Sequence, residues 1–225
     1  MGTLFTLLEK EIRLELRSLE TIVLVPTLSF ILSVIVGLGI SGAFISPETS
    51  LKIFPSLLWL VFFFAATLSV SRGFEIERNN EALQGILLTG VDPGLIYFAK
   101  VLLQTVLVSF TALLAYIFLG LLTSASVFPL ESSIVLVMLV ASLAYSALSV
   151  LLSAVASWTK LKNLFLPVVL IPLLMPVFFG AIECTNEILI TNNFALDSSW
   201  LALLFVCSVI YTISGYNLYR YVVWH

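Results

Sequence analysis

The sequence predicts an all-α polytopic integral membrane protein with six transmembrane helices. Hydrophobic residues make up 60% of the 225 residues and charged residues only 10%, whereas soluble domains contain roughly 45–50% apolar and about 25% charged residues. Long apolar stretches also recur along the chain. A soluble fold is excluded because too little polar surface exists to cover it, and disorder because disordered chains are poor in apolar residues. With 10 Lys and Arg against 13 Asp and Glu, we expect no nucleic-acid partner.

Six stretches have the roughly 20 apolar residues that a membrane-spanning helix needs. The predicted spans are residues 21–44, 53–71, 97–122, 132–156, 163–182 and 199–219. Only Lys100 is ionisable within these limits, and we expect its side chain to reach toward the membrane surface. The first stretch is too long for the apolar part of a cleaved signal peptide. Without an internal repeat or flexible linker, residues 1–225 are interpreted as a single transmembrane permease domain.

The basic residues predict the orientation, because Lys and Arg are enriched in cytoplasmic loops. With one exception they fall near the two termini or in the segments between spans two and three and between spans four and five. The exception is Lys52, on the opposite side. We therefore expect both termini to be cytoplasmic, which agrees with an even number of spans.

The N-terminal segment, residues 1–20, is typical of a helix that lies on the membrane surface. One apolar stripe with helical spacing contains Phe5, Leu8, Ile12, Leu16 and Leu19. Glu9 and Arg13 lie off this stripe and are spaced for an ion pair on one face of the helix. The segment is either a generic membrane anchor or an elbow helix that organises a transporter bundle.

Residues 72–95, between spans two and three, form a segment much longer than a turn requires. It begins with charged residues, and Leu83 and Ile86 then share one helical face. Asp92 is placed to cap the next helix, with Pro93 at its first position. We expect one or two short helices at the cytoplasmic surface, which either dock into a groove on a partner or form a solvated interfacial segment.

Two other features leave their function open. Span five contains Pro167, Pro172 and Pro176, which suit a kinked, moving helix, although membrane helices tolerate proline routinely. The predicted outer loop, residues 183–198, is polar. We expect it to form a short outer helix or cap, and its spacing indicates no function.

Sequence motifs for energy coupling and catalysis are absent. The chain has no G-x-x-x-x-G-K-[ST], no H-E-x-x-H and no nucleophile elbow, so we expect it not to be an enzyme. The single histidine is His225, and Cys184 and Cys207 are too few for a zinc site. We therefore expect no metal and no tightly bound cofactor. These features suit the permease subunit of a transporter whose ATPase is a separate polypeptide.

The chain resembles the CcmB-type haem exporter family, the permease subunit of the cytochrome c maturation ABC transporter. The resemblance covers nearly the whole chain. Its motifs are the Lys10–Arg17 run, Trp59, Arg72-x-Phe74-x-x-Glu77 followed by Leu83, Phe98-Ala99-Lys100, and the proline-rich fifth span. Two departures concern the docking segment: the family often has Gly about where Glu81 stands and an acidic residue about where Gln84 stands.

The resemblance implies a fold like that of ABC-2-type exporters, with an elbow helix, six spans and a cytoplasmic coupling helix, in the bacterial inner membrane. It implies a homodimer of this permease with two CcmA-type ATPase subunits, together with CcmC-type and CcmD-type membrane subunits and a CcmE-type haem chaperone. ATP would bind to the ATPase, and its hydrolysis would drive release of the haem-loaded chaperone. Haem would be a substrate of the complex rather than a cofactor of this chain.

Carried onto this sequence, the resemblance implies that Phe74 supplies an apolar anchor for the ATPase and Glu77 a charge for a basic residue on it. Arg78, Glu81 and Leu83 are further candidates for this contact. Two alternative functions remain open at this stage. One is an ABC-2-type permease for a drug, lipid or polysaccharide, and the other is a membrane-embedded enzyme or non-transporting assembly scaffold.

Overall fold

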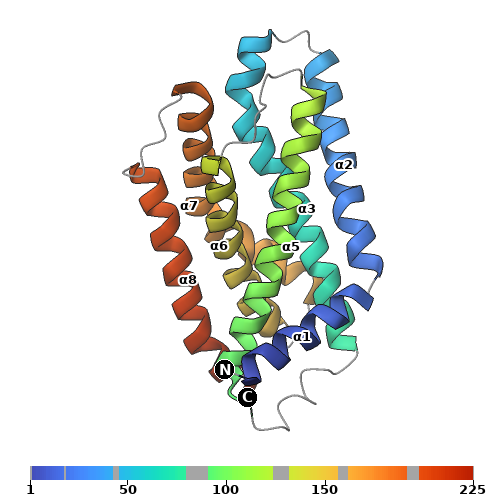
Figure 1. Ribbon diagram of the computed structural model, residues 1–225, viewed down its shortest axis with the longest axis vertical. Coiled ribbons are helices and arrows are strands. Elements are labelled where there is room, and N and C mark those ends of the chain that lie inside the picture. The colour runs from blue at the N-terminus through green and yellow to red at the C-terminus, as the bar shows by residue number, and fades with distance from the viewer. Residues whose placement is uncertain are drawn as a thin grey trace.

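The computed structural model is a bundle of long helices (Figure 1). The structure describes residues 2–17, 19–42, 46–79, 91–123, 132–156, 162–191 and 198–224. The helices in these ranges are α1 (Gly2–Arg17), α2 (Leu19–Gly42), α3 (Pro47–Asn79), α5 (Pro93–Leu122), α6 (Ser132–Ala156), α7 (Lys162–Thr191) and α8 (Ser199–Trp224). No strand occurs in the described ranges, which agrees with the predicted all-α class.

The two chain termini lie at the same end of the bundle (Figure 1). We call this the α1 end, because α1 lies obliquely across it, and we call the opposite end the far end. The α1 end also holds the end of α3, the start of α5 and the end of α8, whereas α3 begins and α7 ends at the far end. Placement of both termini at one end is what an even number of spans predicts.

Five helices are long and apolar enough to cross a membrane among the described residues. Their apolar stretches are Glu48–Leu68, Pro93–Leu122, Ser132–Ala156, Val168–Leu189 and Ser199–Val222. They correspond to predicted spans two to six. The first predicted span, 21–44, corresponds to α2, whose described apolar stretch is the shorter Pro26–Ile40. Membrane insertion of α2, and therefore the count of six, stays a prediction.

Helix α6 is the centre of the bundle and packs against α5, α7 and α8. Within its apolar stretch 72% is buried inside the protein, against 22% for α8. Its buried face is rich in small residues: Ala141, Ser142, Ala144, Ser146, Ala147 and Ser149. Small side chains let neighbouring helices approach closely, which is how helices associate in a membrane. The exposed apolar face of α8, with Phe205 and Ile213, suits lipid.

Two helices begin with a capping side chain. The Asp92 carboxylate accepts from the Gly94 backbone N–H at 3.3 Å, with Pro93 at the first helical position. At the start of α3, the Ser46 hydroxyl accepts from the Thr49 N–H at 3.3 Å, and Pro47 follows it. These caps satisfy N–H groups that have no partner within the helix. The predicted cap at Asp92 is therefore confirmed.

Two helices continue beyond the ends of their predicted spans. The apolar stretch of α3 ends at Leu68, near the predicted residue 71, whereas that of α7 runs to Leu189, past the predicted residue 182. Helix α3 does not end at residue 71 but runs to Asn79, so the predicted coupling segment begins inside the helix of span two. Helix α7 does not end at residue 182 but runs to Thr191, which removes residues 183–191 from the predicted outer loop. Charged side chains end an apolar stretch without ending a helix, and Cys184 and Ile188 keep the buried face of α7 continuous.

Helix α7 also runs through its prolines, and α8 supplies a hydrogen bond there. The Tyr211 hydroxyl donates to the backbone carbonyl of Leu173 at 2.6 Å. The carbonyl that loses its donor because Pro176 has no N–H is that of Pro172, and Leu173 is the next residue along the helix. A side chain from a neighbouring helix commonly satisfies backbone groups at such a position.

Candidate functional site

Three of the predicted ATPase-contacting residues lie at the α1 end. Phe74, Glu77 and Arg78 belong to the last part of α3, and the structure describes their backbone only. Glu81 and Leu83 lie outside the described residues. From Leu68, where the apolar stretch of α3 ends, the helix continues to Asn79, roughly 16 Å farther at 1.5 Å per residue. The structure therefore places the Phe74-to-Arg78 motif on a regular helix that extends past the apolar stretch.

The start of α5 is held from one side by α8, through two close contacts between tyrosines and glycines. Tyr97 is fully buried, and its hydroxyl donates to the Ala147 carbonyl of α6 at 3.0 Å. A Cβ on Gly215 of α8 would lie only 2.0 Å from the Tyr97 hydroxyl oxygen. In the reciprocal contact, a Cβ on Gly94 would lie 2.5 Å from the Tyr216 ring. Glycine at these positions is what lets α5 and α8 approach so closely.

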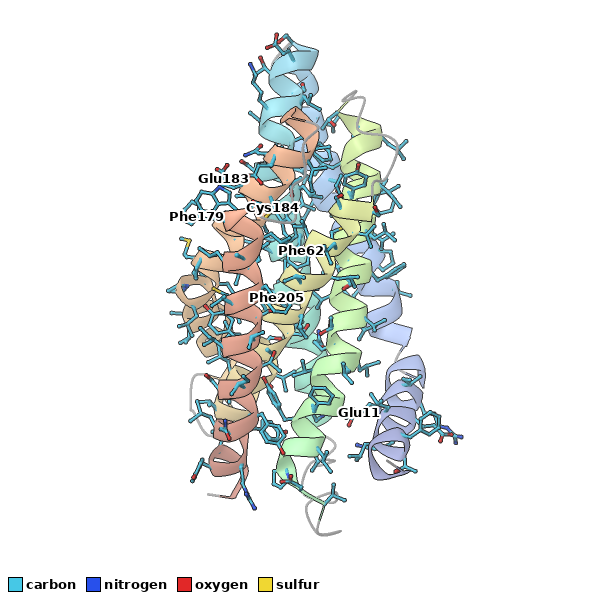
Figure 2. The ribbon with its side chains drawn as sticks, turned by 60° about the vertical axis from the view of Figure 1, so that its left-hand side comes forward. Glu11, Phe62, Phe179, Glu183, Cys184 and Phe205 are labelled. Atoms are coloured by element: carbon cyan, nitrogen blue, oxygen red, sulfur yellow. The ribbon has the colours of Figure 1, made fainter. Side chains whose placement is uncertain are left out.

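The same end of α5 is held from the other side by α1. Leu7 of α1 is buried in a small apolar cluster with Ile96 and Ala99 of α5. One turn after Leu7, Glu11 also faces α5 (Figure 2). Its carboxylate lies 3.6 Å from the Lys100 ammonium nitrogen and 3.1 Å from that of Lys10. The α1–α5 contact therefore combines apolar burial with a charged cluster.

This geometry adds a partner to the expectation for Lys100. Its side chain reaches Glu11 of α1 and is enclosed by the protein: Lys100 is 7% exposed and Glu11 8% exposed. A carboxylate from a helix far away in the sequence offsets the Lys100 charge inside the protein. Sequence reasoning missed Glu11 because it looked for partners within one helix, where Glu9 and Arg13 do pair as predicted. The one sequence feature that pointed to Glu11 was its position as an acidic residue beside the apolar stripe of α1.

In the described part of α1, two members of the apolar stripe are exposed. Phe5 is 70% exposed and Ile12 is also exposed, whereas Leu8 packs against the α1–α5 cluster. A helix with one face packed on the protein and an exposed apolar face beside it suits a position at the membrane interface. The face of α1 that contacts the bundle is that of Leu7 and Glu11.

Between α3, α6 and α7, the bundle interior carries neutral polar groups. The Trp59 indole N–H donates to the Thr185 hydroxyl at 2.9 Å, and the Tyr145 hydroxyl donates to that of Thr67 at 3.2 Å. The ring of Phe62 lies edge to face with both Trp59 and Tyr145. The two hydrogen bonds join α3 to α7 and to α6. Within the part of the chain that the structure describes, no group of three or more His, Cys, Asp or Glu could hold a metal ion.

The far end has polar contacts of a different kind. Glu48 and Lys52 form an ion pair at 2.8 Å one turn apart on α3, with both side chains exposed. The Ser198 hydroxyl donates to the Glu187 carboxylate at 2.6 Å, which joins the end of α7 to the start of α8. Both contacts lie close to the helix ends that they stabilise.

A comparison with protein families identifies the chain. The model of the family described as CcmB protein matches residues 2–216. The chain belongs to the CcmB family. This membership, together with its apolar helices, makes it a membrane permease of the Ccm ABC transporter system, which includes an ATPase partner. A search of curated proteins found no match.

Family membership confirms the resemblance that the sequence motifs indicated. The match includes the Phe74-to-Arg78 motif and Lys100. The contact made by Lys100 lies close to the segment that was expected to meet the ATPase. Asp92 caps α5, and Lys100 lies within three turns of this cap. The buried charge of Lys100 therefore lies shortly after the predicted docking segment, residues 72–95.

Proposed function

We propose that this chain is the membrane permease subunit of an ABC transporter complex that handles haem during cytochrome c biogenesis. A separate CcmA-type ATPase subunit binds and hydrolyses ATP, and the permease passes the resulting movement across the membrane. The cycle releases the haem-loaded CcmE-type chaperone on the other side. The complex contains two permease copies and CcmC-type and CcmD-type subunits in the bacterial inner membrane, with the α1 end in the cytoplasm. Haem is a substrate of the complex, and the chain holds no cofactor tightly.

The observation that carries this proposal is the CcmB-family match over residues 2–216. The arrangement of the bundle supports it. The described basic residues, apart from Lys52, lie in elements at the α1 end, which is the end that enrichment of Lys and Arg assigns to the cytoplasm. The helical extension of α3 lies at that same end and carries Phe74 and Glu77. An ATPase in the cytoplasm would meet this extension.

The geometry also supports a specific route for the coupling. Residues 80–90 connect the extension of α3 to the capped start of α5, which is packed against α1 and α8. A force on the α3 extension or on the connecting segment therefore reaches three helices at once. Phe74 supplies an apolar anchor and Glu77 a charge for a basic group on the ATPase, with Arg78, Glu81 and Leu83 completing the contact.

Co-purification tests the permease assignment. A tagged chain is co-expressed with the CcmA-type ATPase, as wild type, Phe74→Ala and Glu77→Arg, and the ATPase recovered per permease is measured in detergent. Lys52→Glu, a charge reversal at the far end, is the matched control. We expect both test variants to lose most of the ATPase while the control keeps it. Absence of the ATPase from wild type would favour an assembly scaffold, and binding that survives both substitutions would move the docking surface elsewhere.

Complementation tests the haem assignment against the alternative substrates. Cells that lack this chain are expected to lose haem-stained c-type cytochromes and to recover them with the wild-type gene. A permease for a drug, lipid or polysaccharide would leave these cytochromes unchanged.

A further inference from the structure

Tyr97 joins the start of α5 to two other helices. Its hydroxyl donates to the Ala147 carbonyl of α6 at 3.0 Å, and its ring lies 5.4 Å from that of Tyr219 of α8, measured between ring centroids. The hydroxyl also lies against the backbone of α8, because a Cβ on Gly215 would overlap its oxygen. Since Tyr97 is fully buried, these contacts together hold its side chain in one place.

On α8, Gly215 lies between two tyrosines. Tyr211 and Tyr219 are four residues before and after it, and residues four apart in a helix project from the same face. Tyr219 is buried in the apolar cluster that contains Tyr97, and Tyr211 packs against that cluster. The Tyr211 hydroxyl is itself bonded to the Leu173 carbonyl of α7. The Tyr97 hydroxyl therefore fills a gap between two side chains that are held in place.

This arrangement fixes the register between α5 and α8. One helical turn is about 5.4 Å, and a shift of α8 by part of a turn would carry Tyr211 or Tyr219 toward the Tyr97 hydroxyl. Closely packed side chains do not follow such a shift continuously, because a protein interior has few voids. The bond to Ala147 keeps the Tyr97 side chain from moving with α8. The shape of the contact therefore sets the register.

The contact lies directly after the predicted docking segment. Tyr97 is in the second turn of α5, which starts at Pro93 after the Asp92 cap. One turn earlier the roles are reversed, because Gly94 of α5 lies against the ring of Tyr216 of α8. A force that reaches the start of α5 from the docking segment is therefore passed to α8 through two close contacts.

We propose that Tyr97 is a positioning residue that makes the start of α5 and the end of α8 move as one unit when the ATPase acts on the docking segment. This inference rests on the proposed permease function. Tyr97 touches neither ATP nor haem in it and acts through the helices that it joins. The movement that releases the haem-loaded chaperone takes place at other helix contacts, and loss of the Tyr97 contact lowers the release obtained per ATP hydrolysed.

The experiment replaces this contact with a covalent link. Gly94→Cys and Tyr216→Cys are introduced together in a Cys184→Ser, Cys207→Ser background, which gives the parent variant. Removal of the Tyr216 ring opens the space next to position 94. A short bis-methanethiosulfonate reagent then joins the two thiols in the assembled complex, and reductant separates them again. The parent is compared with and without Tyr97→Leu, and mass spectrometry measures the fraction that is linked.

Three quantities are measured: the ATPase recovered per permease, ATP hydrolysis, and haem-loaded chaperone released per ATP hydrolysed. We expect all variants to keep the ATPase, because the residues predicted to contact it are unchanged. Without the link, Tyr97→Leu lowers the release about tenfold, within the range of coupling between linked sites. With the link, both the parent and Tyr97→Leu release chaperone within about twofold of the unlinked parent, because the link restores the coupling.

Tyr116→Leu in the parent is the matched control. Tyr116 is an equally buried tyrosine of α5, and its ring packs edge to face with that of Phe54 of α3. We expect its release per ATP hydrolysed to equal that of the parent, with or without the link. If Tyr97→Leu does not assemble, Tyr97→Phe takes its place. It keeps the ring and loses the hydroxyl, so we expect a loss of about threefold that the link restores.

The linked parent tests the inference without any change at Tyr97. If the link stops chaperone release and reductant restores it, α5 and α8 move relative to each other, and the inference is overturned. Normal release by the unlinked Tyr97 variants, a loss that the link does not restore, or an equal loss in Tyr116→Leu would also overturn it. Absence of the ATPase or of ATP-driven release from the wild-type complex would instead overturn the proposed function.

Discussion

At the α1 end, the charged pair Glu11–Lys100 is buried between two helices, whereas at the far end the pair Glu48–Lys52 lies exposed on one turn of α3. The exposed pair comes from neighbouring turns of one helix and holds no second helix in place. The buried pair joins helices that are distant in sequence. At the α1 end, the same part of α5 also receives the glycine contacts with α8.

The two ends of the bundle are stabilised by different kinds of contact. Exposed ion pairs contribute little to stability, typically about 0–1 kcal/mol. The far half of the bundle is held by neutral hydrogen bonds and aromatic rings, such as the Trp59–Thr185 bond. The α1 end has the contacts that depend most on register: a buried charge pair and close backbone approach. The proposal assigns the ATPase to the α1 end, where α5 makes a buried charged contact with α1 and close glycine contacts with α8.

Substitution of Gly215 should have the largest effect on stability. A Cβ there would overlap the Tyr97 hydroxyl, and Tyr97 is buried and bonded to the Ala147 carbonyl, so it cannot move aside. Gly215→Ala should lower the free energy of unfolding by about 3 kcal/mol, the upper range for overpacking. The melting temperature in detergent, followed with a thiol dye that reaches buried Cys184 on unfolding in a Cys207→Ser background, measures it.

Gly39→Ala is the matched control for Gly215→Ala, because nothing lies within 4 Å of a Cβ at Gly39. Alanine is favoured over glycine in helices by about 1 kcal/mol, so this control should be neutral or slightly stabilising. Equal destabilisation by the two substitutions would contradict the close approach of α5 and α8.

The Trp59–Thr185 bond should have the next largest effect. Thr185→Val leaves the buried Trp59 N–H without its partner and should cost about 1–3 kcal/mol, as expected for an unsatisfied buried donor. Trp59→Phe removes the donor as well and leaves no unsatisfied N–H. The double variant should therefore be less destabilised than the sum of the single variants. Strict additivity in the same dye assay would show that the two side chains do not interact.

Gly94→Ala should have a smaller effect than Gly215→Ala, although both glycines lie in the α5–α8 contact. The obstacle at Gly94 is the Tyr216 ring, which is 42% exposed and can rotate outward. We expect a loss of about 1 kcal/mol, including the weak Tyr216–Asp92 hydrogen bond at 3.4 Å. Gly94→Ala in a Tyr216→Ala background should cost nothing further, and a persistent loss there would place the strain elsewhere.

Lys52→Ala should have the smallest effect, below about 0.5 kcal/mol, because its ion pair with Glu48 is exposed and local. The melting temperature should stay within roughly 2 °C of wild type, given about 2–4 °C per kcal/mol for a chain of this size. A larger shift would mean that the far end depends on charge as the α1 end does, and would remove the contrast between the two ends.

The sequence was sufficient to predict features that depend on residues close together in the chain. Residues 132–156 were predicted as a span and form α6 with these bounds, because an uninterrupted apolar run is a local property. The Asp92 cap and the Glu9–Arg13 pair were also predicted correctly, since each joins residues within one turn. The termini fall at one end of the bundle as expected. The contacts of Phe74, Glu77, Arg78, Glu81 and Leu83 with an ATPase stay predictions.

The helix ends were harder to predict than the helices. Charged residues after Ser71 and after Ile182 marked the ends of apolar stretches, and both were interpreted as the ends of membrane spans. Hydropathy reports where the membrane ends, whereas a helix ends where its backbone hydrogen bonds stop, and the two differ in α3 and α7.

By itself, the sequence determined that this chain is an all-helical membrane protein of the CcmB family. The length of the apolar stretches, the distribution of charge and the motifs all follow from the order of the residues alone. Only the tertiary structure decided that Glu11 meets Lys100 and that Gly215 receives Tyr97. Which face of α1 contacts α5, and which glycine lies opposite a tyrosine, depend on how helices distant in sequence pack together. The physical reason is that a buried polar group is stabilised by its neighbours in space, and those neighbours exist only once the bundle has formed.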